Sequence, residues 1–472
     1  MLDLSKDRKP SFGQALTVLL GIISILIVGI LGFGLDIHVL LILGLILTCF
    51  VAIKVGYSFD ELIDAMKDGL GKAMAAILIF ILIGMIIGSW IQAGTVPALI
   101  YYGLKFLNPK FFLPAGLIVC SITSFATGTS WGTAGTVGLA LMGMGMGLGI
   151  PAPAIAGMVV SGAFFGDKMS PLSDTTILAA ASADCDMYDH IGAMMYTMVP
   201  TYIISLIIYT FLGFRYSSSN AMASAEVAQL QEVLLAKFNL NPIVILPIIV
   251  VLILSFMKVS SVPALTLGTF LGTAIAIIFQ GSSIKAALAA LNYGYTEATG
   301  IVMVDKLLIR GGIQGMMWTF SLAIIALCLG GVLEKTGFLT VLIEKVLTKI
   351  NSAANLITVS LLSAIIGNAA MSEVYLSIIL NGSLYRDAYE AKGLKKSMLS
   401  RVLEEGATMS GALIPWTTCG AFIAGALGVS TMEYLPYSLL NIINPIMTIV
   451  LSYLGIFVLY ENKAPKAAKA TK

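Results

Sequence analysis

The chain has 472 residues, of which 58% are hydrophobic and 11% charged, and its formal net charge is +2. A soluble fold carries about 25% charged residues, so this chain would lack the polar side chains to cover a water-exposed surface. The near-neutral charge offers no basic face for nucleic acid, and the five scattered cysteines show no metal-binding or disulfide spacing. The composition therefore predicts a multi-pass membrane protein with no cofactor.

The first predicted element is a retained membrane helix at 12–34. Its length of about 20 residues suffices to cross a bilayer, and no convincing signal-peptide cleavage site follows it. Two later apolar stretches, 111–149 and 354–382, are too long for one span and carry polar residues in their middle, so we expect re-entrant hairpins or broken helices there. The other predicted spans are 37–56, 73–92, 151–186 (interrupted), 189–214, 241–257, 259–280, 315–334, 398–428 (interrupted) and 434–460.

The two halves of the chain repeat the same features. Gly94 matches Gly337 at an offset of 243 positions, which also places Ser130 opposite Glu373, while the stretch around Asp174 needs an offset of 240 to 242. The predicted organisation is a cytoplasmic N-terminus at 1–11, a first transmembrane repeat at 12–215, a polar linker at 216–240, a second transmembrane repeat at 241–460 with an insertion near 299–314, and a basic cytoplasmic tail at 461–472.

Basic residues predict the orientation of the repeats. They flank both ends of the chain, so both termini are expected in the cytoplasm. The connection at 383–401 holds five lysines and arginines, whereas its counterpart at 143–161 holds no charged residue. Matched connections on opposite sides of the membrane make the repeats inverted. We therefore predict an all-α polytopic membrane protein, with two inverted-topology repeats, broken helices, re-entrant hairpins and about 10–12 membrane segments.

Glycines and hydroxyls interrupt the first repeat at 127–133, TGTSWGT. Exposed backbone groups would find no water in lipid, so these residues suit a helix that breaks and lines a cavity. The hydroxyl oxygens of Thr129 and Ser130 are suitable ligands for a small hard cation. The alternative is close helix packing by small residues.

The most polar interruption is GDKMSPLSDTT at 166–176. An unpaired Asp174 would be costly in the membrane, so its carboxylate must face protein, water or a cation. The residues after it are expected to open a new half-helix, whose positive end suits an anion while unwound carbonyls suit a cation. The alternative is a solvated loop in which Asp167 and Lys168 pair.

In the second repeat the strongest candidate is Glu373, at the end of GNAAMSE. Two-fold pseudo-symmetry would bring it near Asp174, and two neighbouring carboxylates can share a proton or a cation. The alternative is a glutamate at the aqueous end of a hairpin. The predicted ion-binding set, with Asp174, Thr129 and Ser130 as Na⁺ ligands, is Thr129, Ser130, Asp167, Lys168, Ser170, Ser173, Asp174, Thr175, Thr176, Asn368, Ser372, Glu373, Thr417 and Thr418.

No enzyme signature competes with transport. The sequence has neither a GxSxG run nor a Walker-type loop, and no histidine lies near the candidate serines. An enzyme and an ATP-driven pump are therefore not expected.

The run at 166–176 resembles the signature of the NhaC family of sodium/proton antiporters, and TSWGT at 129–133 and RGGIQGMMW at 310–318 also look like that family. The resemblance covers nearly the whole chain. It implies exchange of Na⁺ for H⁺, and some members instead carry Na⁺ with lactate against malate and protons. The chain has ILAA at 177–180, where an Asn-Leu-Ala-Pro run is common, so one candidate amide ligand is missing.

Three functional interpretations remain. The first is a Na⁺/H⁺ antiporter in which Asp174 and Glu373 titrate. The second is a Na⁺-coupled exchanger of small carboxylates such as malate and lactate, bound by Lys168 and the half-helix. The third, a channel or structural protein, is disfavoured because paired broken helices indicate alternating access. The expected location is a bacterial-type cell membrane with surrounding lipids, and a homodimer is left open.

Overall fold

A computed structural model describes residues 8–461, apart from 107, 220–223, 258, 302, 303, 306, 307 and 349. The described part is helical, with a single isolated β-bridge between Leu394 and Tyr460. Seven described helices are long and apolar enough to cross a membrane, or up to ten if each bent pair counts as one span. The prediction of an all-α polytopic membrane protein is confirmed. The predictions for residues 1–7 and 462–472 lie outside the described residues.

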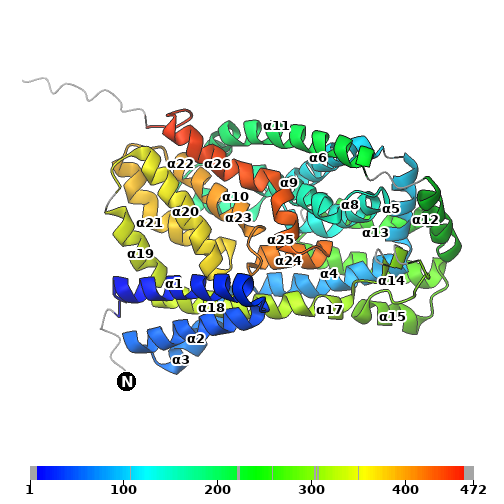
Figure 1. Cartoon of the computed structure of the whole chain (residues 1–472), viewed down its shortest axis with the longest axis horizontal. Coiled ribbons are helices and arrows are strands. Elements are labelled where there is room, and N and C mark those ends of the chain that lie inside the picture. Colours follow the sequence, from blue (N-terminus) through cyan, green and yellow to red (C-terminus); the bar gives the residue numbers. More distant parts are fainter. Residues whose placement is uncertain are drawn as a thin grey trace, which may run out of the picture.

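Several of the long helices, among them those at Phe12–Ile27, Met74–Gln92 and Met317–Thr336, run along the longest dimension of the molecule (Figure 1). The first half contains α1 (Phe12–Ile27), α2 (Ile37–Val55), α3 (Phe59–Lys72), α4 (Met74–Gln92), α5 (Thr95–Phe106), α6 (Pro109–Thr127), α7 (Ser130–Thr133), a π-helical turn η2 (Ala134–Gly138), α8 (Leu139–Gly147), α9 (Ala152–Met169), α10 (Asp174–Ser182) and α11 (Met187–Ser219). The α1 helix continues into the π-helical turn η1 (Val28–Gly32).

The second half repeats this order after α12 (Ser224–Lys237), which forms much of the predicted linker. Its elements are η3 (Pro242–Ile245), α13 (Leu246–Phe256), α14 (Ser261–Phe279), α15 (Ile284–Tyr293), α17 (Gly312–Gly315), α18 (Met317–Thr336), α19 (Phe338–Leu347), α20 (Ala353–Met371), α21 (Val374–Ala391), α22 (Lys396–Leu403), η4 (Glu404–Thr408), α23 (Met409–Gly411), α24 (Thr418–Leu427), α25 (Thr431–Tyr434), η5 (Leu435–Tyr437) and α26 (Leu439–Tyr453).

Both predicted hairpin stretches are broken helices with the same backbone path. The α6 helix ends at Gly128 in the left-handed region (φ 71°), and extended Thr129 (φ −145°) starts α7. In the second half α20 ends at left-handed Ser372 (φ 62°), and extended Glu373 (φ −142°) starts α21. Glycine adopts this conformation without a steric penalty, whereas Ser372 does not. At each break the first backbone N–H groups of a helix have no carbonyl partner within that helix.

These breaks correct the sequence alignment of the halves. The structure places Thr129, and not Ser130, opposite Glu373, because the second half has one more residue between Gly337 and its break. In the second broken pair the extended residue before α10, Ser173, lies opposite Thr417 before α24. The true offset is therefore 244 at both breaks. The domain boundaries and the inverted orientation of the halves stay predictions.

Each half packs one of its helices on the other half. The α3 helix of the first half packs on α18 of the second, and α15 of the second half packs on α4 of the first. A Cβ added to Gly88 of α4 would lie 2.2 Å from the carbonyl oxygen of Ala290, and one added to Gly331 of α18 would lie 2.2 Å from that of Ala65. Gly88 and Gly331 are matched positions of the repeat, as are Ala65 and Ala290. The same close backbone contact is therefore made twice, reciprocally.

One substitution tests this contact. Gly69→Ala in α3 is expected to destabilise the protein by about 1–3 kcal/mol, since its Cβ would lie 2.5 Å from the carbonyl oxygen of Leu327 in α18. Gly71 lies on the same helix with open space around its Cβ position, so Gly71→Ala is expected to be neutral or slightly stabilising. Thermal unfolding of the detergent-solubilised variants measures both effects. An equal loss in the two variants would contradict the close approach of α3 and α18.

Candidate functional site

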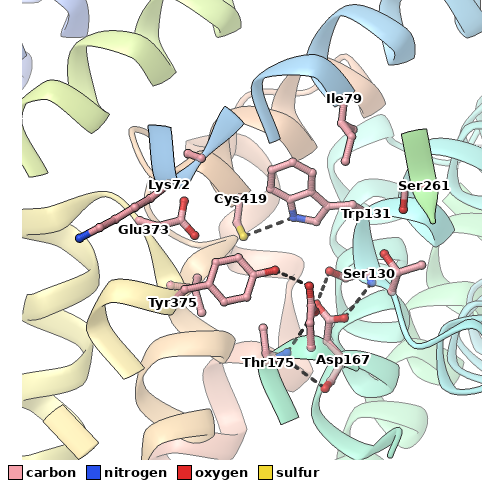
Figure 2. Close-up of a pocket in the computed structure, with 14 residues that line it drawn as sticks. Lys72, Ile79, Ser130, Trp131, Asp167, Thr175, Ser261, Glu373, Tyr375 and Cys419 are labelled. Atoms are coloured by element: carbon pink, nitrogen blue, oxygen red, sulfur yellow. Dashed lines mark hydrogen bonds between the residues drawn. The ribbon is translucent and has the colours of Figure 1, made fainter. Parts of the chain in front are cut away.

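A cavity of about 180 Å³ lies where the ends of α7, α10, α21 and α24 meet. Figure 2 shows side chains from both halves of the chain converging on it, among them Ser130, Asp167 and Tyr375. Six of the predicted ion-binding residues line the cavity: Thr129, Ser130, Asp167, Asp174, Thr175 and Glu373. A second cavity of about 540 Å³ shares Thr129 and Asp174 with the first. The three hydroxyls and three carboxylates of these six residues give the wall of the first cavity the oxygen ligands that a small cation needs.

Asp167 is held by the break before α7. It lies in the last turn of α9 and is 7% exposed. One carboxylate oxygen accepts a hydrogen bond from the backbone N–H of Ser130 at 3.0 Å, and the other accepts from the Ser130 hydroxyl. An acidic group at a helix N-terminus is stabilised by the unpaired N–H groups there. The break therefore keeps a carboxylate fixed at the cavity wall.

The start of α10 braces the end of α9. The hydroxyls of Thr175 and Thr176 donate to the carbonyl oxygen of Asp167, at 3.3 and 2.5 Å. Ser173 and Ser170 are buried beside them, and the Ser170 hydroxyl accepts from the N–H of Leu172 at 3.2 Å. The predicted half-helix after 166–173 is confirmed, but most of its hydroxyls support the backbone of the site and do not line the cavity.

Asp174 takes the more open position. Its side chain is exposed to both cavities and accepts a 2.6 Å hydrogen bond from the hydroxyl of Tyr375. Tyr375 belongs to α21, which begins immediately after Glu373, so it links the two halves across the cavity. The sequence motif contained no signal for this tyrosine.

Glu373 is the matching buried carboxylate of the second half. It is 5% exposed, and its carboxylate accepts a 2.6 Å hydrogen bond from the hydroxyl of Thr418 at the start of α24. The backbone N–H of Thr418 donates to the carbonyl oxygen of Ser372 at 2.9 Å. The structure therefore places Glu373 and Asp174 at one cavity, as the pseudo-symmetry argument predicts.

Two other predicted side chains form hydrogen bonds with the backbone around the site. The Thr417 hydroxyl accepts from the N–H of Gly420 at 3.0 Å and so caps α24. The Asn368 amide donates to the carbonyl oxygen of Ala407 at 2.9 Å. Neither these two side chains nor Ser372 lines the cavity.

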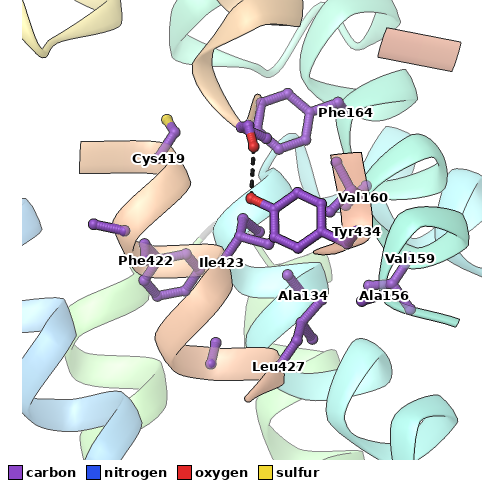
Figure 3. Close-up of a cluster of buried hydrophobic side chains, with 14 of the residues drawn as sticks. Ala134, Ala156, Val159, Val160, Phe164, Cys419, Phe422, Ile423, Leu427 and Tyr434 are labelled. Atoms are coloured by element: carbon purple, nitrogen blue, oxygen red, sulfur yellow. Dashed lines mark hydrogen bonds between the residues drawn. The ribbon is translucent and has the colours of Figure 1, made fainter. Parts of the chain in front are cut away.

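Aromatic rings close one wall of the cavity. The rings of Trp131 and Phe422 stack with centroids 4.3 Å apart and planes 6° apart, and the Trp131 indole N–H points at the sulfur of Cys419 at 3.4 Å. A buried apolar cluster that includes Phe164 of α9, Ile423 of α24 and Tyr434 of α25 surrounds the short α24 helix (Figure 3), which packs on η2, while α25 packs on α9. This packing fixes the position of the short α24 helix.

Lys168 points away from the cavity. Its ammonium donates to a carboxylate oxygen of Glu405 at 3.1 Å and to the amide oxygen of Asn444, and all of its side chain is buried. The same glutamate accepts hydrogen bonds from Thr197 and Thr448. The structure therefore does not show the expected pairing of Lys168 with Asp167 or Asp174, because the lysine follows the opposite face of α9 into a separate buried cluster.

The other charged residues of that cluster were not predicted from the sequence. Arg401, Glu404 and Glu405 are completely buried in α22 and η4. They lie inside the predicted interrupted span at 398–428. Three charged residues within five positions of an apolar stretch could have indicated this buried cluster.

The cavity contains no free cationic group among the described residues. Lys72 lines it, but its ammonium forms a 2.6 Å ion pair with Glu334 and points away from Asp167 (Figure 2). The electrostatic character of the cavity is therefore set by its carboxylates, which favours a cation over an anion.

Comparison with known proteins agrees with this chemistry. The model of the Na⁺/H⁺ antiporter family matches residues 10–192 and 162–456. The chain is 39% identical to the malate-2H⁺/Na⁺-lactate antiporter of Bacillus subtilis strain 168, over 98% of this chain and 99% of that protein. It is 38% identical to the arginine/ornithine antiporter ArcD of Halobacterium salinarum, over 96% and 94% of the two chains. It is 36% identical to the Na⁺/H⁺ antiporter NhaC of Alkalihalophilus pseudofirmus, over 95% and 97%. The chain belongs to the Na⁺/H⁺ antiporter family.

Proposed function

We propose that this protein is a secondary antiporter that exchanges Na⁺ for H⁺ across the cell membrane, with both termini in the cytoplasm. The observation that carries the proposal is the convergence of Asp167, Asp174 and Glu373 on one cavity between broken helices of the two halves. Ionised carboxylates and neutral hydroxyl oxygens bind Na⁺, and the same carboxylates bind protons. Competition between the two cations for one set of groups couples their movement.

The carboxylates have different tasks in this proposal. Asp167 is preoriented by Ser130 and presents a fixed negative charge to the cation. Asp174, with Thr129 nearby, faces both cavities and receives the cation from water. The hydrogen bond from Tyr375 to Asp174 connects cation binding to the packing of α10 against α21. Rearrangement of that interface would open the site to one side of the membrane at a time.

A Na⁺-coupled exchanger of small organic substrates is the second candidate. It is favoured by the 39% identity to the malate-2H⁺/Na⁺-lactate antiporter and by a cavity of about 180 Å³, which holds roughly six waters at about 30 Å³ each. A bare cation needs much less space. Against an organic anion stand the carboxylate walls and the pairing of both nearby lysines, Lys72 and Lys168, with glutamates.

Transport by the purified protein separates the two candidates. In proteoliposomes with an acidic interior, labelled Na⁺ is expected to accumulate in the absence of any organic substrate, and the lumen is expected to become alkaline as protons leave. Labelled malate and lactate are expected not to accumulate above protein-free vesicles. Uptake of Na⁺ that requires lactate inside or outside would reject simple Na⁺/H⁺ exchange and support the second candidate.

A further inference from the structure

The buried charges of the described residues do not balance. Two basic side chains, Lys168 and Arg401, are buried together with four carboxyl groups. If all were ionised the interior would carry two uncompensated negative charges, which is costly in a membrane protein. The four carboxyl groups are those of Asp167, Glu373, Glu404 and Glu405.

Three of the four carboxyl groups have partners. Glu405 pairs with Lys168 at 3.1 Å and lies 3.8 Å from Arg401. Asp167 and Glu373 accept hydrogen bonds and also face the cavity, where a cation can neutralise them.

Glu404 is the exception. Its side chain is fully buried, and neither of its carboxyl oxygens has a hydrogen-bond partner. It does not line the cavity. The hydroxyl of Thr408, one turn further along, also lacks a partner. A cation in the cavity therefore cannot bind Glu404 directly, whereas a proton on its carboxyl group removes the buried charge.

The charged groups on the elements around η4 decide whether cation binding in the cavity changes the protonation of Glu404. The α9 helix contributes Lys168 and the like charge of Asp167, and both interact electrostatically with Glu404. The α22 helix contributes Arg401, η4 itself Glu405 and α21 Tyr389, whereas α10 contributes the hydroxyl of Thr175. The α20 and α26 helices contribute only amides and hydroxyls near η4. Asp167 therefore both lines the cavity and interacts electrostatically with Glu404.

We propose that Glu404 is a proton-binding site behind the cation cavity, protonated while the cavity is empty and ionised when Na⁺ is bound beside Asp167. With the cavity empty, the negative charge of Asp167 favours a proton on Glu404, since like charges disfavour double ionisation. Bound Na⁺ cancels that charge, and Glu404 then releases its proton to water and balances Lys168 and Arg401. No covalent bond forms or breaks except the O–H bond of the carboxyl group.

This inference rests on the proposed Na⁺/H⁺ exchange, and proton release on Na⁺ binding tests it. Addition of Na⁺ to the wild-type protein in weakly buffered detergent solution is expected to release protons, detected with a pH indicator. The Glu404→Gln variant is expected to bind Na⁺ and to release about one proton fewer. Na⁺ affinity is expected to fall on acidification, and the fall should be about tenfold per pH unit steeper in the wild type than in the variant, in which only the cavity carboxylates still bind protons. Glu390→Gln changes an exposed glutamate of α21 and is the matched control, expected to behave as wild type.

Infrared difference spectra of the wild-type protein test Glu404 without relying on the variant's folding. Addition of Na⁺ is expected to remove a band of a protonated carboxyl group, and the band should be missing in Glu404→Gln. Absence of any such Na⁺-sensitive band in the wild type overturns the inference, as does wild-type proton release by a folded Glu404→Gln variant. Failure of the wild type to bind Na⁺ would instead reject the proposed function.

Discussion

Asp167→Asn is expected to reduce pH-driven Na⁺ uptake about 100-fold, the largest functional loss of any single change at the cavity. The asparagine side chain keeps the size of aspartate and can still accept the hydrogen bond from the Ser130 N–H, so the break before α7 should remain intact. It removes the negative charge that attracts the cation, and a charged interaction of this kind contributes about 1.5–3 kcal/mol. Initial rates of labelled Na⁺ uptake in proteoliposomes measure the loss.

Two further substitutions serve as comparisons for Asp167→Asn. Asp60→Asn alters an exposed aspartate of α3 and is expected to transport at the wild-type rate. Asp174→Asn, at the open side of the cavity, is expected to raise the Na⁺ concentration needed for half-maximal uptake. Wild-type uptake by a correctly folded Asp167→Asn variant would remove Asp167 from the cation site.

The largest loss of stability is expected from Lys168→Met. It would leave Glu405 completely buried without its ammonium partner at 3.1 Å, and breaking a buried pair in this way costs about 3–5 kcal/mol. Thermal unfolding in detergent measures the loss.

A surface ion pair is the control for that experiment. Lys396 pairs with Asp184, and their side chains are 51% and 64% exposed. The hydrogen bond from the Lys396 ammonium lowers the pKa of Asp184, but solvent screens the pair, so Lys396→Met should leave the unfolding temperature unchanged. Equal effects of Lys168→Met and Lys396→Met would contradict a stabilising role for the buried pair.

Local sequence signals were sufficient to predict most of the helix ends and starts that surround the cavity. Gly128 followed by Thr129 marks a helix end and a new helix start, and Ser173 marks the start of α10. Such caps depend on neighbouring residues alone, so they can be read from a sequence. The break in 354–382 was predicted from the length of that stretch and its polar residues, but its exact position was not, since serine gives no signal for the left-handed conformation of Ser372.

Long-range contacts could not be predicted in the same way. The sequence motif favoured Asp174 as the buried carboxylate, whereas the structure buries Asp167, because Asp167 is capped by Ser130 in another helix. Lys168 has aspartates next to it in sequence, yet its partner is Glu405, 237 positions away. One residue of helical rotation decides which face a side chain takes, and hydropathy does not resolve such a rotation.

The packing of α3 on the second half of the chain also sets an order for biosynthesis. The α3 helix ends at Lys72 and its partner α18 begins at Met317, so roughly 245 residues must be synthesised before the two can meet. At about 5–20 residues per second this takes roughly 12–50 s. Until then Gly69 and the rest of the α3 contact face have no protein surface to pack on, and the N-terminal helices must wait in the membrane. Docking of α3 is therefore a late event of assembly, and chains that terminate before α18 should be substrates for membrane quality control.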